Sequence, residues 1–187
     1  MEVLGLGSMS LARKLLARIV VALAAALVGA AHAGNSTDEY AVKAAMIWNF
    51  TKFIQWPASS LGDRSGPFVI GVYGDDPFDG KLEAAVRGKD VDGRPVAVRN
   101  FRTSVEGRVH VLFIAESMKS RWRDLGILHG KPILLVGESE GFVKGTGHIA
   151  FVNDERRVAF VIGNRAAQSA GLSISSKLLA LAKKVDP

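Results

Sequence analysis

Apolar and polar residues alternate along this chain with periods that predict helices and strands in turn. Apolar residues at helical spacing, after a polar segment with a capping pattern, predict a first helix over 37–55, which Pro57 ends. Short apolar runs between turn residues predict strands over 68–73, 95–100, 109–115, 132–136, 148–152 and 157–162. The last two strands flank a short polar turn, so they are predicted to form a hairpin.

Further helices are predicted between and after the strands, over 75–87, 117–128, 164–170 and 173–184. A glycine-rich loop is expected over 137–147. Helices and strands alternate in the first half of the chain, and a hairpin and two helices close it. This order predicts an α/β fold, with a single domain built on a mixed β-sheet of about five or six strands flanked by helices on both faces.

The first predicted helix carries one large aromatic residue on its polar side. At roughly 100° per residue, one broad arc holds the apolar residues Val42, Met46, Ile47, Phe50, Phe53 and Ile54. Trp48 falls opposite this arc, beside Thr51, Lys52 and Gln55. Tryptophan is enriched among the residues that dominate protein interfaces, so Trp48 and Lys52 are candidate partner-binding residues. The alternative for Trp48 is a ring packed on a neighbouring loop. Trp122, in a basic stretch, is a further partner-binding candidate.

The N-terminal segment has the three parts of a secretory signal peptide. Basic residues precede an uncharged apolar run over 19–31, and residues 31–33 (Ala-His-Ala) form a small-x-small cleavage pattern. A spanning helix needs about 20 apolar residues, so an uncleaved anchor is the less favoured alternative. We therefore expect a signal peptide over 1–33 that is cut after Ala33, a folded domain over 34–187, and export to the periplasm.

Composition excludes several kinds of site and partner. The chain has no Cys, which excludes disulfides, thiolate metal sites and a cysteine nucleophile. Its 24 Lys and Arg against 18 Asp and Glu give a net charge of +6, and the basic residues are scattered rather than grouped in blocks. A nucleic-acid partner is therefore not indicated.

One short pattern resembles a hydrolase nucleophile motif. Residues 137–141 (Gly-Glu-Ser-Glu-Gly) match G-x-S-x-G and follow a predicted strand. The motif needs a helix after the serine, and an acid and then a histidine further along. Here a loop is expected instead, and only His148 follows. A chance resemblance is the favoured interpretation, and an esterase that uses Ser139 is the alternative.

The other polar residues form no catalytic, metal or cofactor pattern. His110, His129 and His148 are isolated in the sequence, without the spacing of a zinc motif. Asp75 and Asp76 lie at a predicted turn and helix start, where capping explains them. The glycine motifs that bind nucleotides are missing. We predict no catalytic residue, no metal site and no cofactor, and hence a binding or regulatory protein rather than an enzyme.

Five segments of the chain, taken in order, resemble the YfiR family. The longest, 43–57 (KAAMIWNFTKFIQWP), is similar to the opening K-A-A-F-x-Y-N-F-x-K-F-x-x-W-P of that family. The others are 74–78 (GDDPF), 93–96 (GRPV), 110–114 (HVLFI) and 170–179 (AGLSISSKLL). The resemblance covers nearly the whole expected domain, and it implies a small periplasmic α/β protein that is often dimeric.

The resemblance also implies a function. The best-known member represses a membrane-bound diguanylate cyclase by binding its periplasmic sensor domain, and an outer-membrane lipoprotein relieves the repression. Lower cyclase activity means less cyclic di-GMP and less biofilm matrix. The cysteine that often precedes the segment 110–114 in this family is Val109 here, so redox control through disulfides is excluded. The usual F-E-I-N run reads FVIG over 160–163, which removes an acid.

Two functions from different classes follow. The first is a periplasmic non-enzymatic regulator that binds and represses the sensor domain of an inner-membrane signalling enzyme, with an outer-membrane lipoprotein and a second copy of the chain as further candidate partners. The alternative is a periplasmic small-molecule-binding protein that serves a sensor or transport system. Its ligand is expected near 74–78 or 137–147, where loops follow predicted strands of an α/β sheet.

Overall fold

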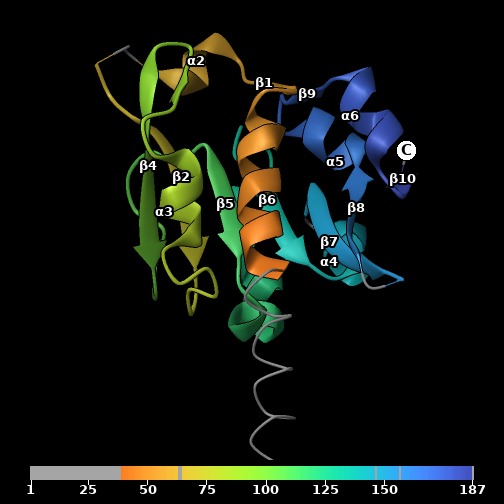
Figure 1. Cartoon of the computed structure of the whole chain (residues 1–187). Helices are drawn as coiled ribbons and strands as arrows, with labels where there is room; N and C mark the ends of the chain where they lie inside the picture. Colours follow the sequence, from red (N-terminus) through yellow and green to blue (C-terminus); the bar gives the residue numbers. More distant parts are fainter. Residues whose placement is uncertain (1–38, 63–64, 146, 156, 187) are drawn as a thin grey trace, which may run out of the picture. The chain divides into compact units, whose positions relative to one another are not determined.

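The structure is a computed structural model, and it describes residues 39–62, 65–145, 147–155 and 157–186 (Figure 1). The expected signal peptide and its cleavage position lie outside these residues, so both stay predictions. Contacts between Cα atoms group Tyr40–Pro187 into one unit. Nowhere in the described ranges is there a helix with the length and apolar character that a membrane span requires.

A mixed sheet forms the centre of this unit (Figure 1). In the described residues it has 8 strands, in the spatial order β10-β8-β7-β6-β5-β2-β4-β3. Their bounds are β2 (Phe68–Tyr73), β3 (Asp90–Val91), β4 (Arg94–Phe101), β5 (Val111–Ile114), β6 (Leu134–Glu138), β7 (Ile149–Asp154), β8 (Arg157–Gly163) and β10 (Lys184–Asp186). The pairs β7–β8 and β3–β4 are antiparallel, and the other neighbours are parallel.

This sheet confirms the predicted α/β class, with more strands than expected. The extra strands β3 and β10 lie at the two edges of the sheet and have 2 and 3 residues. Strands this short carry no apolar run, so periodicity does not reveal them. The predicted hairpin is confirmed as β7–β8, and the strand predicted over 68–73 is β2.

Helices cover both faces of the sheet, as predicted. They are a first helix over 39–51, α2 (Ala58–Leu61), α3 (Lys81–Val86), the 3-10 helix η1 (Glu116–Leu128), α4 (Glu140–Gly145), α5 (Asn164–Ser169) and α6 (Ser176–Leu181). The first helix, α3, α5 and α6 lie in front of the sheet in Figure 1, and η1 and α4 lie behind it. Each layer of helices closes its own apolar core.

Strand β2 shows how one strand supplies both cores. Phe68, Ile70 and Val72 pack into the core beneath the first helix, whereas Val69 and Tyr73 pack into the core beneath η1 and α4. This division follows from the strand geometry, because successive side chains point to opposite faces of a sheet. All six residues of β2 are buried, which explains its continuous apolar run.

Both terminal helices are shorter than predicted. The first helix ends at residue 51, and Ile54 and Gln55 form a short strand, β1 (Ile54–Gln55), instead of a last helical turn. The predicted helix over 173–184 is reduced to α6 between β9 (Ser173–Ile174) and β10. Hydrogen bonds to distant segments compete here with local helix formation: the amide of Lys183, for example, donates to the Phe160 carbonyl at 2.9 Å.

Two further segments differ from the prediction, one by gaining a helix and one by starting its helix later. The glycine-rich segment 137–147, expected as a loop, contains the helix α4. The helix expected from Asp75 begins only at Lys81, because Asp76 folds the preceding segment into a turn, with its Oδ1 accepting from the amide of Phe78 at 2.8 Å.

Candidate functional site

A two-stranded ladder joins two segments that lie far apart in the sequence. Strands β1 and β9 pair antiparallel, with Ile54 opposite Ile174 and Gln55 opposite Ser173. The amide of Ser175 extends the contact by donating to the Phe53 carbonyl at 2.9 Å. The ladder places the end of the first helix beside the start of α6.

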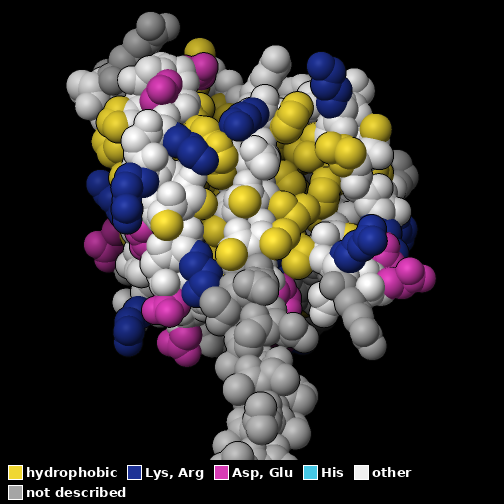
Figure 2. Space-filling view, viewed as in Figure 1, with side chains coloured by type: hydrophobic (Ala, Val, Ile, Leu, Met, Phe, Trp, Pro, Cys, Tyr) yellow, Lys and Arg dark blue, Asp and Glu magenta, His cyan; other side chains and the backbone are white. Residues whose placement is uncertain are grey.

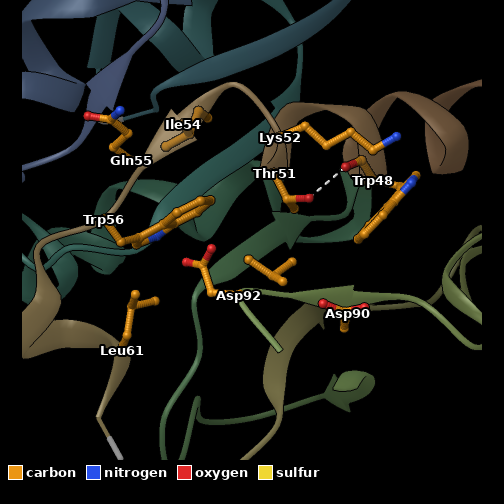
Figure 3. Close-up of a pocket in the computed structure, with 10 residues that line it drawn as sticks. Trp48, Thr51, Lys52, Ile54, Gln55, Trp56, Leu61, Asp90 and Asp92 are labelled. Carbon is orange, nitrogen blue, oxygen red and sulfur yellow. Dashed lines mark hydrogen bonds between the residues drawn. The ribbon is translucent and has the colours of Figure 1, made fainter. Parts of the chain in front are cut away.

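A pocket of about 560 Å³ opens beside this ladder (Figure 3). It lies between the end of the first helix, β1, α2 and the turn that follows β3. Its lining residues are Trp48, Thr51, Lys52, Ile54, Gln55, Trp56, Leu61, Asp90, Val91 and Asp92. A smaller pocket of about 130 Å³ is lined by Lys52, Phe53, Gln55, Ser173 and Ser175. Lys52 and Gln55 therefore line both pockets.

The buried side of the first helix matches the predicted one only in part: Ile47, Phe50 and Ile54 are buried as predicted. Trp48 is 8% exposed and Thr51 is 4% exposed, whereas Val42 is 46% exposed. Polar residues can lie on the buried side because their polar atoms have partners: Thr51 Oγ1 donates to the Trp48 carbonyl at 2.7 Å, and Lys43 pairs with Glu138. The prediction that Val42 faces the core was therefore wrong.

Trp48 and Lys52 are brought together at one end of the larger pocket. The Nζ atoms of Lys52 and Lys89 lie 5.2 Å and 4.9 Å from the centroid of the Trp48 ring, within range of a cation–π interaction. Trp48 is packed into the core, and Lys52 is exposed. Their partner-binding role stays a prediction, with Lys52 the more accessible of the two.

Trp122, the third partner-binding candidate, lies on the other face of the sheet. It is partly exposed, and its ring stacks on Phe142 with centroids 5.4 Å apart. Both residues belong to the core beneath η1 and α4, whereas Trp48 belongs to the opposite core. The structure therefore does not bring Trp122 into one surface with Trp48 and Lys52.

A buried ion pair ties the first helix to the end of β6. Lys43 Nζ lies 2.5 Å from Glu138 Oε1, and the two side chains are only 7% and 13% exposed. The hydroxyl of Tyr40 donates to the same carboxylate oxygen at 3.0 Å. Lys43 opens the segment 43–57 that resembles the YfiR family, and Glu138 belongs to the G-x-S-x-G pattern. Their pairing gives both residues a structural role that the local sequence did not reveal.

Trp56 connects the larger pocket to a buried histidine. Its Nε1 donates to the backbone carbonyl of His110 at 3.2 Å, and Phe68 packs between the Trp56 and His110 rings, with centroids 5.1 Å and 4.5 Å away. Burial first, and then the positive charges of Arg108 and Arg94, lower the pKa of His110 to about 4. His110 is therefore neutral at physiological pH.

His148 is buried in the same manner. Burial first, and then the nearby His129, lower the pKa of His148 to about 4. Its Nδ1 atom accepts a hydrogen bond from the Leu135 amide at 3.1 Å. In the part of the chain that the structure describes, no three His, Asp or Glu side chains gather so as to hold a metal ion.

The G-x-S-x-G pattern does lie on a strand–turn–helix unit, contrary to the expectation of a loop. Ser139 connects β6 to α4 and has a φ of 147°, which is unfavourable for a residue with a side chain. The glycines of the pattern are explained by packing: a Cβ atom at Gly137 would lie 2.7 Å from the Phe142 ring, and one at Gly141 would lie 3.3 Å from the Trp122 ring.

The loops where a ligand was expected are filled by side chains. A Cβ atom at Gly74 would lie 2.6 Å from Met118, and the hydroxyl of Ser117 accepts from the Asp75 amide at 2.9 Å. The ring of Phe142 fills the space beside Gly137 and Gly147. The larger pocket instead combines the first helix with the β3–β4 turn.

Sequence reasoning missed Trp56, Asp90 and Asp92 as pocket residues. The one available signal was Asp92-Gly93, a dipeptide typical of two-residue hairpin turns. This signal predicts a turn, but it does not indicate which distant segment the turn packs against.

Comparison with protein families gives one match. The model of the family described as YfiR/HmsC-like matches residues 40–183, which include all five segments that resemble this family. A search of curated proteins found no match. Since the family match covers most of the chain, including the first helix, the central sheet and α6, the chain belongs to the YfiR/HmsC-like family.

Proposed function

We propose that this protein is a periplasmic regulator that binds the periplasmic sensor domain of an inner-membrane diguanylate cyclase and represses it, which lowers cyclic di-GMP. Membership of the YfiR/HmsC-like family supports this proposal. The regulator acts by binding one state of the sensor domain more tightly than the other. A preference of about 100-fold corresponds to a difference of roughly 2.7 kcal/mol in binding free energy between the two states, and the population shifts by the same amount of free energy.

An exposed apolar surface carries the proposal. Val42 on the first helix is 46% exposed and Leu181 on α6 is 69% exposed. Met46, Phe53 and Leu179 are partly exposed on the same face of the sheet. Figure 2 shows hydrophobic side chains gathered over the first helix and towards α5 and α6. Contiguous apolar patches on soluble proteins commonly mark interaction sites, and we assign this one to the sensor domain.

The first test measures binding to the purified periplasmic domain of a cyclase encoded beside this protein's gene. The variant Val42→Glu/Leu181→Glu places charges at two exposed apolar positions, and we expect its affinity to fall by about tenfold or more. Ile127→Glu is the matched control, because Ile127 is 76% exposed but lies on η1, on the other face of the sheet. Equal affinities for wild type and the double variant would refute the assignment of this surface.

A second test measures repression itself. Deleting the gene should raise cellular cyclic di-GMP, and the wild-type gene should restore the low level, whereas the Val42→Glu/Leu181→Glu gene should not. An outer-membrane lipoprotein and a second copy of this chain are further partners within the proposal. Competition binding with the lipoprotein and sedimentation of the purified protein test them. Unchanged cyclic di-GMP after deletion would contradict the regulatory function.

The larger pocket favours a second candidate function, the binding of a small molecule. Its volume of about 560 Å³ lies in the range that small ligands occupy. A ligand that binds the folded state raises the melting temperature. We expect such a rise with the purified protein alone if the pocket is a ligand site.

A further inference from the structure

We propose that Arg94 and Arg108 form a binding site for a small oxyanion, a phosphate or carboxylate group, beside α2 and next to the larger pocket. This inference goes beyond the two functions proposed above, and it holds whether or not the pocket itself takes a ligand. Three observations on the described residues carry it: two guanidinium groups meet at one glycine, one of them is buried without a counter-charge, and buried donors around it have no acceptor.

The guanidinium groups of Arg94 and Arg108 meet at the glycine that follows α2. Arg94 Nη2 donates to the Gly62 carbonyl at 3.1 Å. The Arg108 guanidinium lies against the same residue, in the space that a Cβ atom on Gly62 would fill. Gly62 directly follows Leu61, which lines the larger pocket on the side where Figure 3 shows Trp56. Two positive charges are therefore held close together beside this end of the pocket.

Arg94 is a buried charge without a counter-charge in the described residues. It is only 5% exposed, at the start of β4. It belongs to the same face of the sheet as Val96 and Val98, which pack against the core beneath the first helix, because alternate residues of a strand share a face. Within the described ranges, neither Arg94 nor Arg108 forms an ion pair with an Asp or Glu side chain. An unpaired buried charge is costly, so a bound anion would stabilise the folded state.

Two buried donors in this part of the fold have no acceptor among the residues that the structure describes. One is Arg94 Nε and the other is His110 Nε2. His110 Nδ1 accepts from the Val69 amide, so the neutral ring carries its proton on Nε2. His110 lies close enough to both arginines for their charges to lower its pKa. Buried polar groups normally have partners, so this excess of donors favours a ligand that supplies acceptors.

The geometry of the guanidinium group indicates the class of anion. Nε and Nη2 form one edge of the planar group, and this edge matches two oxygens of a phosphate or carboxylate. On this edge of Arg94, Nη2 donates to Gly62 and Nε remains available. Arg108 is exposed, so it offers a second positive charge on the side open to solvent. Two positive charges attract a doubly charged phosphate more strongly than a singly charged carboxylate.

The test compares three sodium salts at equal ionic strength and near neutral pH: phosphate, acetate and chloride. Binding to the purified protein is measured by calorimetry, and the melting temperature is measured in each salt. We expect phosphate at roughly ten times its Kd to raise the melting temperature by about 3 °C or more. Acetate should act less strongly and chloride least, because chloride cannot offer two oxygens to the guanidinium edge. Tighter binding of acetate than of phosphate would identify a carboxylate as the group that the site takes.

Arg108→Gln is the main variant, because Arg108 is exposed and its replacement should leave the fold intact. We expect it to weaken phosphate binding about fivefold or more. Arg165→Gln, at an exposed position on α5, is the matched control and should bind phosphate as the wild type does. Arg94→Met removes the buried charge but keeps a long side chain, and it should abolish the rise in melting temperature that phosphate causes. If Arg94 only held the Gly62 carbonyl, Arg94→Met would lower the melting temperature equally in all three salts.

A further variant tests an acid of this chain as the counter-charge. Asp63 follows Gly62 in the sequence and lies outside the described residues. If only Asp63→Asn binds phosphate and the wild type does not, the arginines serve the chain's own carboxylate and the inference is overturned. Equal melting temperatures in phosphate, acetate and chloride, or equal phosphate binding by wild type and Arg108→Gln, would overturn it as well. Phosphate or acetate binding that Arg108→Gln weakens and Arg165→Gln keeps would support it.

Discussion

The imidazole of His110 takes the place of a backbone carbonyl as the hydrogen-bond acceptor for the Val69 amide. His110 Nδ1 accepts a hydrogen bond from the Val69 amide at 2.9 Å, and the His110 amide donates to the Val69 carbonyl at 2.9 Å. His148 and Leu135 are joined by the same two bonds, at 3.1 Å and 3.0 Å. Each histidine directly precedes a strand and completes the hydrogen bonding of the neighbouring strand. Both rings must stay neutral, because a protonated Nδ1 cannot accept a hydrogen bond.

The first prediction concerns the pH dependence of folding. The pKa values of His110 and His148 fall from 6.5 to about 4 on folding, so between these pH values the unfolded chain binds more protons than the folded protein. The stabilisation is complete above pH 6.5 and is lost as the pH falls towards 4. For each histidine, the free energy of unfolding falls by about 3 kcal/mol at most over this pH range. Urea denaturation across this pH range measures the loss.

His110→Asn separates the titration of the histidine from its packing. The Asn side chain can still accept the Val69 hydrogen bond but does not titrate, so we expect a lower free energy of unfolding with a smaller pH slope. His129→Asn is the comparison: the His129 side chain is exposed and contributes less than burial does to the low pKa of His148, so we expect a smaller change in the pH slope. If the pH slope of His110→Asn equals that of the wild type, the neutral-histidine argument is wrong.

The second prediction concerns the buried ion pair of Lys43 and Glu138. Lys43→Met leaves the Glu138 carboxylate almost buried without its cation, and we expect a loss of about 3 kcal/mol in the free energy of unfolding. The double variant Lys43→Met/Glu138→Leu should recover part of this loss, since it removes both charges. Chemical denaturation of the three proteins measures these differences.

An exposed pair on the same protein supplies the comparison. Lys119 and Glu116 are 2.6 Å apart but 57% and 54% exposed, so Lys119→Met should cost less than about 1 kcal/mol. Equal losses from Lys43→Met and Lys119→Met would show that burial does not control the strength of the Lys43–Glu138 interaction.

The third prediction distinguishes the packing of Trp48 from a role in partner binding. Trp48→Ala leaves a cavity in the core beneath the first helix, and we expect a loss of about 3–5 kcal/mol. Lys52→Ala, at an exposed position, should change stability by less than about 0.5 kcal/mol. Thermal unfolding and partner binding are measured on both variants. A Trp48→Ala protein that melts as the wild type does but fails to bind would identify Trp48 as an interface residue instead.

The fourth prediction concerns the strained backbone at Ser139. A φ of 147° is accessible to glycine at little cost, so Ser139→Gly should be more stable than Ser139→Ala by about 1 kcal/mol. We also expect no hydrolysis of a chromogenic ester by the wild type beyond that of Ser139→Ala. Ester hydrolysis that disappears in Ser139→Ala would restore the esterase alternative.

Periodicity predicted the elements that are apolar throughout or alternate regularly. Strand β2 and the β7–β8 hairpin were predicted because a buried strand requires a continuous or alternating apolar pattern. Strands β1, β9 and β10 were not predicted, because their 2 or 3 residues are held by pairing with remote segments. Such pairing is not encoded by any local pattern.

The candidate site was predicted only in part. Trp48 and Lys52 were selected from the first helix, and both line the larger pocket. Their partners in the pocket, Asp90 and Asp92, come from a hairpin turn whose position depends on the order of strands in the sheet. Trp122 was selected by residue type, and the structure separates it from the other two.

The amino-acid sequence by itself determined the α/β class, the positions of the main strands and the family. These properties follow from apolar periodicity and from motifs that are continuous along the chain. The tertiary structure alone decided that Trp48 and Thr51 are buried and Val42 is exposed, where the pocket lies and which charged residues line it. Helix periodicity treats Lys43 and Thr51 as surface residues, whereas the fold supplies Glu138 and the Trp48 carbonyl as partners and so allows burial.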